Sequence, residues 1–209
     1  GAMWLVMDRP DTFNAMTPGM NVALTRHVRD SAIRDDVRVV VLTGAGDAFC
    51  AGADISPDAS GADAIERFDV RAMDAANALV RAIVECPKPV LAAVNGIAAG
   101  VGCSAALAAD IIVARDSASF LLAFARIGFM PDGGTSATVA AAIGRPRAMR
   151  MALLAEPLSA TEAYDAGLIT HLAATEEYDA VVATLARRLA AGAPLSQTAT
   201  KRAVNAATL

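Results

Sequence analysis

Short apolar runs that alternate with stretches of helical spacing constrain the fold more than any other feature of this 209-residue chain. The runs lie at 37–42, 90–94 and 110–114, and each is rich in Val or Ile. Such nearly unbroken runs are typical of buried strands. Apolar side chains at intervals of three and four residues over 20–33 and 64–83 indicate helices around them. Strands that alternate with helices predict crossover connections and a layered α/β domain.

Turn and capping signals predict the remaining elements. A short strand is expected at 4–7, and Thr17 followed by proline is an N-cap signal for the helix over 20–33. A helix is expected at 101–109 and another short strand at 119–122. Beyond these, Ala, Leu and Met indicate helices near 134–143, 146–155, 160–166, 176–191 and 196–207. We therefore expect one domain over 1–209, with a core of about 1–145 and a helical C-terminal part of about 146–209.

The composition excludes several classes of protein. With 55% hydrophobic and 19% charged residues, the chain can bury a large core and is not a disordered scaffold. Its 18 basic and 22 acidic residues are interspersed, so nucleic acid is not an expected partner. Polar and small residues interrupt every apolar run, so no membrane span is expected. Cys50, Cys86 and Cys103 form no metal-binding or disulfide pattern, which favours a reducing cytoplasm and predicts no metal site.

Two loops that follow predicted strands are candidates for a functional site. Small residues fill the first, at 47–54, and would let backbone amides face a ligand. Glycines in the second, at 95–104, lead into a helix whose first amides lack internal partners and attract negative charge. Neither loop is a nucleotide-binding fingerprint, because the required third glycine and the P-loop lysine are absent. Each loop alone is typical of an ordinary strand-to-helix turn, and only the pair indicates a site.

Short motifs run through the chain in a consistent order and spacing. They are Asp-Arg-Pro at 8–10, Phe-Asn-Ala at 13–15, Val-Val-Val-Leu-Thr-Gly at 39–44, Ala-Phe-Cys-Ala-Gly-Ala-Asp at 48–54, Pro-Lys-Pro-Val at 87–90, Ala-Val-Asn-Gly at 93–96, Ala-Asp-Ile-Ile at 109–112 and Ile-Gly-Phe-Met-Pro-Asp-Gly-Gly at 127–134. Together they resemble the enoyl-CoA hydratase/isomerase family, also called the crotonase family. The resemblance implies a spiral of repeated ββα units, followed by a helical C-terminal part shorter than usual. It also implies trimers or hexamers of identical chains.

The resemblance further implies an acyl-CoA thioester as the substrate, with no separate cofactor because coenzyme A is part of that substrate. Two backbone amides, which by position resemble those of Ala53 and Val101, would stabilise an enolate-like oxyanion. The residues expected to line the substrate site are Ala51, Gly52, Asp54, Gly100, Ser104 and Phe124. Asp54 is also expected to cap backbone amides that hold the first loop.

The residues at the positions of the catalytic acid and base differ from those of the family's hydratases. Two carboxylates that hydratases use fall on Ser104 and Phe124, neither of which can position and protonate water. Asp132 matches instead a carboxylate of isomerase-type members similar to the ring-opening epoxide-CoA isomerases. Burial near Phe124, Ile127 and Phe129 would raise the pKa of Asp132 and make it a better base. A structural alternative is that Asp132 only caps the helix that follows it.

Several functions therefore stay open at the level of sequence. Isomerisation of an enoyl-CoA double bond with Asp132 as acid and base is the first, since one carboxylate can move one proton. Hydration of a 2-enoyl-CoA is the second, and an acyl-CoA-binding protein without catalysis is the third. A Ser104 hydrolase is the last, because neither His27 nor His171 is placed near Ser104 by its sequence context.

Overall fold

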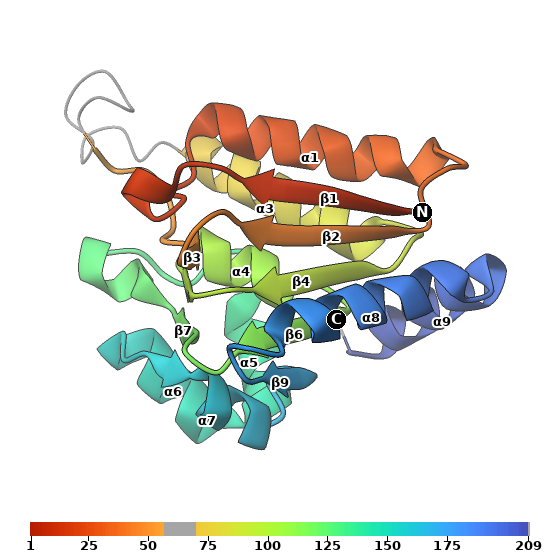
Figure 1. Cartoon of the computed structure of the whole chain (residues 1–209). Coiled ribbons are helices and arrows are strands. Elements are labelled where there is room, and N and C mark those ends of the chain that lie inside the picture. The colour runs from red at the N-terminus through yellow and green to blue at the C-terminus, as the bar shows by residue number, and fades with distance from the viewer. Residues whose placement is uncertain (57–69, 209) are drawn as a thin grey trace.

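The computed structural model describes residues 1–56 and 70–208. Its elements, drawn in Figure 1, are β1 (Ala2–Met7), η1 (Pro10–Thr12), α1 (Pro18–Ile33), β2 (Val39–Gly44), β3 (Ala48–Cys50), α3 (Val70–Glu85), β4 (Val90–Val94), β5 (Ile97–Ala99), α4 (Val101–Leu107), β6 (Ile111–Arg115), β7 (Ser119–Leu121), η2 (Ala123–Ile127), α5 (Thr135–Ile143), α6 (Arg145–Leu154), β8 (Leu158–Ser159), α7 (Ala160–Asp165), β9 (His171–Ala173), α8 (Tyr178–Ala191) and α9 (Pro194–Thr208). No described helix combines the length and apolarity needed to cross a bilayer.

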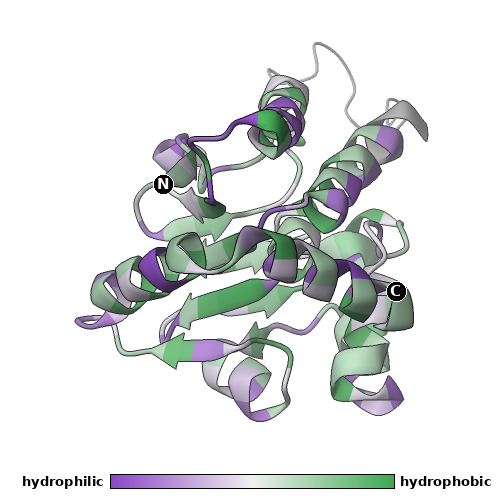
Figure 2. Ribbon diagram, turned by 90° about the vertical axis from the view of Figure 1, so that its right-hand side faces the viewer, coloured by the Kyte–Doolittle hydropathy of each residue, from purple (hydrophilic) through white to green (hydrophobic). Residues whose placement is uncertain are grey.

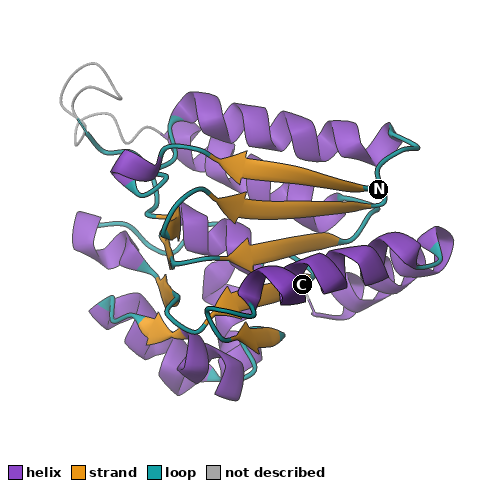
Figure 3. Ribbon diagram, viewed as in Figure 1, coloured by secondary structure: helices purple, strands orange, loops and turns teal. Residues whose placement is uncertain are grey.

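The strands form two sheets that the chain visits alternately. The larger sheet has the order β1-β2-β4-β6-β9 and is parallel throughout. The smaller has the order β3-β5-β7-β8, with only β8 antiparallel. After β2, β4 and β6 the chain passes directly to β3, β5 and β7, and helical segments then lead back to the large sheet (Figure 3). The predicted α/β spiral of ββα units is therefore confirmed.

Helices cover both faces of the large sheet, which explains why its strands are apolar at nearly every position. Val40 and Leu42 point into the main core, which also contains apolar residues of α1 and α3. Val41 and Leu91 point to the opposite face, where α8 packs with Tyr178 and other apolar residues. Figure 1 shows α8 in front of the strands, and Figure 2 shows those strands as mostly hydrophobic between helices of mixed character. A strand buried on both faces has no polar side.

Four short strands were not predicted from the sequence. β3 and β5 lie within the two candidate loops, and β8 and β9 lie in the C-terminal part that was expected to be wholly helical. β9 extends the large sheet by pairing with β6, where His171 lies opposite Val113. The prediction of a wholly helical C-terminal part was therefore wrong. Strands of two or three residues are too short to show the alternating pattern by which a strand is predicted. Residues 64–69 of the helix predicted at 64–83 lie outside the described residues.

Close approach between α4 and β3 requires glycine at position 102. A Cβ atom on Gly102 would lie 2.6 Å from the Cβ and the carbonyl oxygen of Cys50. Gly102 has ordinary helical geometry, so close packing rather than an unusual backbone conformation explains the glycine. This contact holds the start of α4 against the end of β3, and so joins the two candidate loops, which contain Cys50 and Gly102.

We expect Gly102→Ala to reverse the usual effect of an alanine in a helix. Replacing a helical glycine by alanine normally stabilises a protein by up to about 1 kcal/mol. Here the added methyl group meets Cys50, and overpacking should lower the free energy of unfolding by about 1–3 kcal/mol. Chemical denaturation measures this difference. Gly19→Ala in α1 is the matched control, because its nearest heavy atom would be 3.9 Å away; equal effects of the two variants would contradict the packing account.

Candidate active site

A cavity of about 460 Å³ opens at the carboxyl ends of the three parallel strands of the small sheet. The loops after β3, β5 and β7 supply most of its wall, and η1 leads into the segment 16–18 that completes one side. All of the residues predicted for the site line this cavity except Ser104: Ala51, Gly52, Ala53, Asp54, Gly100, Val101, Phe124 and Asp132. The fold thus brings together two loops that are about 50 positions apart in sequence.

The two loops touch at a pair of glycines. Gly52 and Gly100 both have positive φ, of 103° and 50°. A Cβ atom on Gly52 would lie 3.2 Å from the carbonyl oxygen of Ala99 and 3.7 Å from the Cα of Gly100. Side chains at either position would strain the backbone and separate the loops. Because each glycine precedes a predicted oxyanion residue, this contact brings the amides of Ala53 and Val101 to the same wall.

Both of these amides are free to bind a ligand. Met16 pairs with the first loop, donating its N–H to Gly52 O at 2.7 Å and accepting from Asp54 N at 3.0 Å. The N–H of Ala53, between these two positions, therefore faces away from Met16. Val101 is the first residue of α4, where an amide has no partner inside its helix. Within residues 1–56 and 70–208, neither amide donates to another protein group.

Two carboxylates line the cavity, Asp54 and Asp132, and Asp132 is the one that forms no ion pair with a described residue. Its Oδ1 accepts a hydrogen bond from Ser104 Oγ at 3.0 Å. Burial raises the pKa of Asp132 above its ordinary value, as expected, and the bond from Ser104 opposes that rise. The capping alternative is wrong: Gly134 is the N-cap residue of α5, and Thr135 donates to the backbone carbonyl of Asp132 rather than to its carboxylate. The side chain of Asp132 is thus not used to cap α5.

Ser104 lies behind Asp132 rather than on the wall of this cavity. It lines a second, larger cavity of about 760 Å³ bounded by α3, α4, α5 and α9. The charged residues Asp110 and Lys201 of that cavity pair with each other at 2.8 Å. The smaller cavity is the better candidate for an active site, because the amides of Ala53 and Val101 and the carboxylate of Asp132 line the same wall there.

Asp54 closes the first loop. Its Oδ1 accepts from the backbone N–H of Ser56 at 3.1 Å and from the Ser56 hydroxyl at 2.6 Å, and its Oδ2 pairs with Arg9 Nη1 at 2.7 Å. The Ser56 hydroxyl, and after it Arg9, hold the pKa of Asp54 below its usual range. Arg9 also donates to Ala15 O at 2.6 Å. The capping expectation for Asp54 is confirmed, whereas the pairing with Arg9, 45 residues away, was not predicted.

Sequence reasoning also missed much of the apolar wall. Ile127 and Phe129 line the cavity with Asp132, as expected, but Met16 and Met130 also line it without having been predicted. So does the cation Arg126, which donates to Ala155 O at 2.8 Å. No pattern marked these residues, because single apolar side chains in loops have no periodicity.

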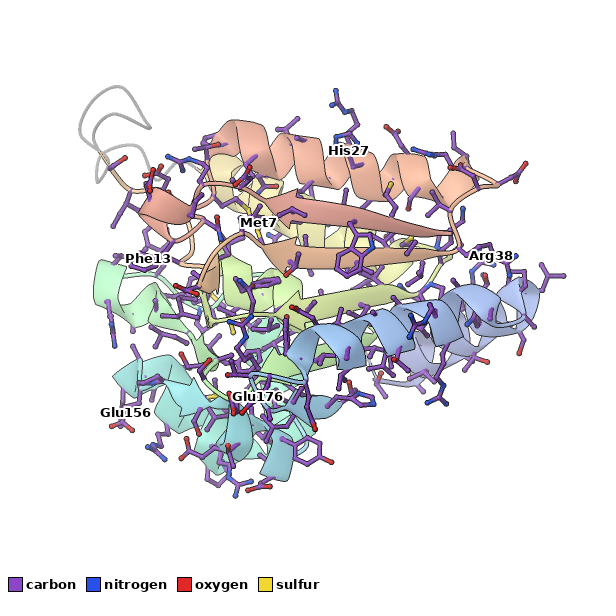
Figure 4. The ribbon with its side chains drawn as sticks, viewed as in Figure 1. Met7, Phe13, His27, Arg38, Glu156 and Glu176 are labelled. Carbon is purple, nitrogen blue, oxygen red and sulfur yellow. The ribbon has the colours of Figure 1, made fainter. Side chains whose placement is uncertain are left out.

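The two histidines lie away from this site. His27 is exposed on α1 and points away from the sheet (Figure 4), and His171 Nδ1 lies 3.0 Å from Thr170 Oγ1. Neither lines the cavity. Across residues 1–56 and 70–208, no group of three His, Cys, Asp or Glu side chains is placed to hold a metal ion.

Comparison with known proteins identifies the family. A protein-family model described as enoyl-CoA hydratase/isomerase matches residues 1–209. The chain belongs to the enoyl-CoA hydratase/isomerase family. A crystal structure of an enoyl-CoA hydratase from Mycobacterium avium subsp. paratuberculosis K-10 superposes with a TM-score of 0.91 at 43% identity, covering 100% of this chain and 82% of that one. The α/β fold is therefore of the crotonase type, and the chain is an enzyme of this family.

Similar curated proteins carry two kinds of name. The 1,2-epoxyphenylacetyl-CoA isomerase of Escherichia coli K12 is 37% identical over 215 residues, covering 99% of this chain and 79% of that protein. A probable enoyl-CoA hydratase of Rhodobacter capsulatus is 43% identical over 171 residues, covering 81% of this chain and 64% of that protein. Isomerases and hydratases thus both occur among the relatives of this family member.

We expect Asp54→Ala to loosen the loop that carries Ala53. Losing the hydrogen bonds of a charged group costs about 1.5–3 kcal/mol, so amides in 51–56 should exchange with deuterium about 10- to 100-fold faster. Hydrogen-exchange mass spectrometry measures this rate. The control is Asp36→Ala, which breaks an exposed pair with Arg34 that contributes about 0–1 kcal/mol. Unchanged exchange at 51–56 in Asp54→Ala would show that this aspartate does not hold the loop.

Proposed function

We propose that this family member moves a double bond in an enoyl-CoA thioester, with Asp132 as acid and base. The observation that carries the proposal is the composition of the cavity wall, which holds the carboxylate of Asp132 and the two free amides of Ala53 and Val101, while its other carboxylate, Asp54, is paired with Arg9. The positions where the resemblance placed two hydratase carboxylates hold Ser104 and Phe124. A single carboxylate can remove one proton and return it elsewhere on the same substrate.

The chemistry follows from where charge develops. Asp132 removes a proton from the carbon next to the thioester carbonyl of a 3-enoyl-CoA, and negative charge moves onto the thioester oxygen. The amides of Ala53 and Val101 stabilise that oxygen more strongly than the neutral carbonyl, which lowers the barrier. The same carboxyl group then returns the proton to the γ carbon, so the double bond moves to the 2 position. Atoms balance without water or a cofactor.

Phe124 favours isomerisation over hydration. Its side chain is 7% exposed and lines the same cavity as Asp132, in a position where a hydratase needs a group that holds water. An apolar surface there excludes water and raises the basicity of the carboxylate. Hydration of a 2-enoyl-CoA, which the names of several relatives suggest, is the competing activity that the first experiment below separates.

The oligomer and the compartment belong to this proposal. We propose a trimer or hexamer of identical chains. The adjacent side chains of Leu153 and Leu154 on α6 are 65% and 64% exposed, and large apolar residues of this kind are typical of contact surfaces.

All three cysteines are free and buried, which supports the cytoplasmic location that the sequence predicted.

We expect Asp132→Asn to abolish isomerisation while acyl-CoA binding persists. Asparagine keeps the shape of the side chain but cannot accept the proton, and loss of a general base costs about 100- to 10,000-fold in rate. Mass spectrometry and proton NMR of the products from 3-enoyl-CoA and 2-enoyl-CoA measure the reaction. Isomerisation adds no mass, whereas hydration adds one water. Thermal melting controls for folding, and full activity in Asp132→Asn would remove this residue from the mechanism.

The rate should also depend on pH in a defined direction. Burial raises the pKa of Asp132, and a protonated carboxyl group cannot act as the base. We therefore expect kcat/KM of the wild-type chain to fall as the pH decreases through that raised pKa, and to level off above it. The pH profile of isomerisation measures this limb, and a profile that stays flat on the acid side would contradict a carboxylate base.

We expect Val101→Pro to remove one oxyanion donor selectively. Proline lacks an N–H but is tolerated at the first position of a helix, and the preceding residue, Gly100, has no Cβ to clash with the ring. The loss of one donor should reduce kcat about 100- to 1,000-fold. Val101→Ala is the matched control, since it shortens the side chain and keeps the amide, and it should lose far less. Equal kcat in the two variants would argue against the amide as a donor.

A further inference from the structure

Ser104 is the closest polar partner of the carboxylate in the candidate active site. Its Oγ lies 3.0 Å from Asp132 Oδ1, and the side chain is buried on α4. No side chain of residues 1–56 or 74–208 and no described backbone amide donates a hydrogen bond to Asp132 Oδ2. The carboxylate therefore has one oxygen held by the protein and one left for a ligand in the cavity.

The surroundings of Ser104 serve both protonation states of Asp132. The Ser104 hydroxyl can donate to the carboxylate, and it also lies 3.3 Å from Gly100 O. When Asp132 carries a proton, that hydroxyl can accept from the carboxyl group and donate to Gly100 O. Since Gly100 precedes the predicted oxyanion donor Val101, Ser104 links the base to the oxyanion loop.

The backbone next to Asp132 is fixed by two other contacts. Gly133 N donates to Asn77 Oδ1 on α3 at 3.1 Å. Gly133 has a φ of 57°, and a Cβ there would lie 2.8 Å from the Cβ of Ser104 and 2.9 Å from a methyl group of Val80. The segment therefore packs directly against α3 and α4, so the distance between Ser104 and Asp132 does not depend on a freely moving loop.

We propose that Ser104 is a positioning residue for Asp132: it holds Oδ1 so that Oδ2 faces the substrate, and it adapts its hydrogen bond as Asp132 gains and loses the proton. The role in turnover rests on the proposed function, whereas the contact itself does not. From the sequence, Ser104 was expected to line the substrate site in place of a hydratase carboxylate, with a nucleophilic role as the remaining alternative. The geometry instead gives the serine a task that a second carboxylate could not perform without repelling Asp132.

The other charged side chains on the cavity wall have partners of their own and are not among the causes that shift the pKa of Asp132. Asp54 and Arg126 are the other charged side chains on the described wall of the cavity. Arg9 neutralises the first, and the second donates to a backbone carbonyl. From residues 74–85 of α3, whose side chains the structure describes, Ala75 and Ala76 line the cavity. Burial and Ser104 are the causes that act on the pKa of Asp132, in opposite directions.

The test measures the carboxylate directly and without substrate. Aspartate is labelled with ¹³C at the carboxyl carbon, and Asp132→Asn identifies the resonance of Asp132. A hydrogen bond to a charged group contributes about 1.5–3 kcal/mol, so Ser104→Ala should raise the pKa of Asp132 by about one to two units. Ser104→Cys keeps the shape but donates weakly, and should give an intermediate value. Cys103→Ala, which removes one buried heavy atom from the neighbouring residue, should leave the pKa unchanged.

Kinetics then separate the inference from the proposed function. The acid limb of the kcat/KM profile should move up by the same one to two pH units in Ser104→Ala, with a fall in kcat at high pH and little change in KM. An unchanged pKa of Asp132 in both Ser104 variants would overturn the inference. A raised pKa together with undiminished turnover in Asp132→Asn would support the contact between Ser104 and Asp132 and overturn the proposed function and the positioning role in turnover.

Discussion

The close approach of two backbone segments at Gly52 and Gly100 is the contact on which the rest of the site depends. Only residues without a Cβ allow the loop after β3 to lie against the loop after β5 at van der Waals distance with both backbones at positive φ. Gly102 allows α4 to pack on Cys50 directly below. Gly52 and Gly100 are needed for their positive φ, and Gly102 is needed for close packing. The positions of the two free amides therefore depend on all three glycines together.

The arrangement of the sheets explains why the site forms where it does. Three parallel strands of the small sheet end at the same edge, so the segments after β3, β5 and β7 share one cavity although they come from different turns of the spiral. The large sheet has α1 and α3 on one face and α8 on the other, and its strands contribute apolar side chains to the core cluster on each face. Val101 and Phe124 of the cavity wall belong to the same hydrophobic cluster as the large sheet, so the segments that form the site are anchored in the core.

The sequence predicted the parts of the molecule that have a pattern. The apolar runs at 37–42 and 90–94 predicted buried strands, which the structure has at 39–44 and 90–94, and the Thr17 cap appears as expected with a bond from Met20 N. The short strand β9 could not be predicted, because three residues have no period and its pairing with β6 depends on contacts 58 positions apart. For the site, small-residue loops indicated both amides, but nothing local indicated that Arg9 would pair with Asp54 or that Asn77 would bind Gly133. Contacts between distant segments depend on the fold rather than on neighbouring residues.

The replacement of two hydratase positions by Ser104 and Phe124 acts on one group, the carboxylate of Asp132. Phe124 belongs to the apolar wall whose burial disfavours the charged form and makes the carboxylate a stronger base. Ser104 stabilises the charged form and limits how far the pKa rises, so that the base stays ionised often enough to act. For the proposed isomerisation a carboxylate at either position would be unfavourable, because it would repel Asp132. At position 124, on the cavity wall, it would also hold water that a proton shuttle must exclude. Ser104 and Phe124 are therefore best understood together, as the environment of one base rather than as the loss of two catalytic carboxylates.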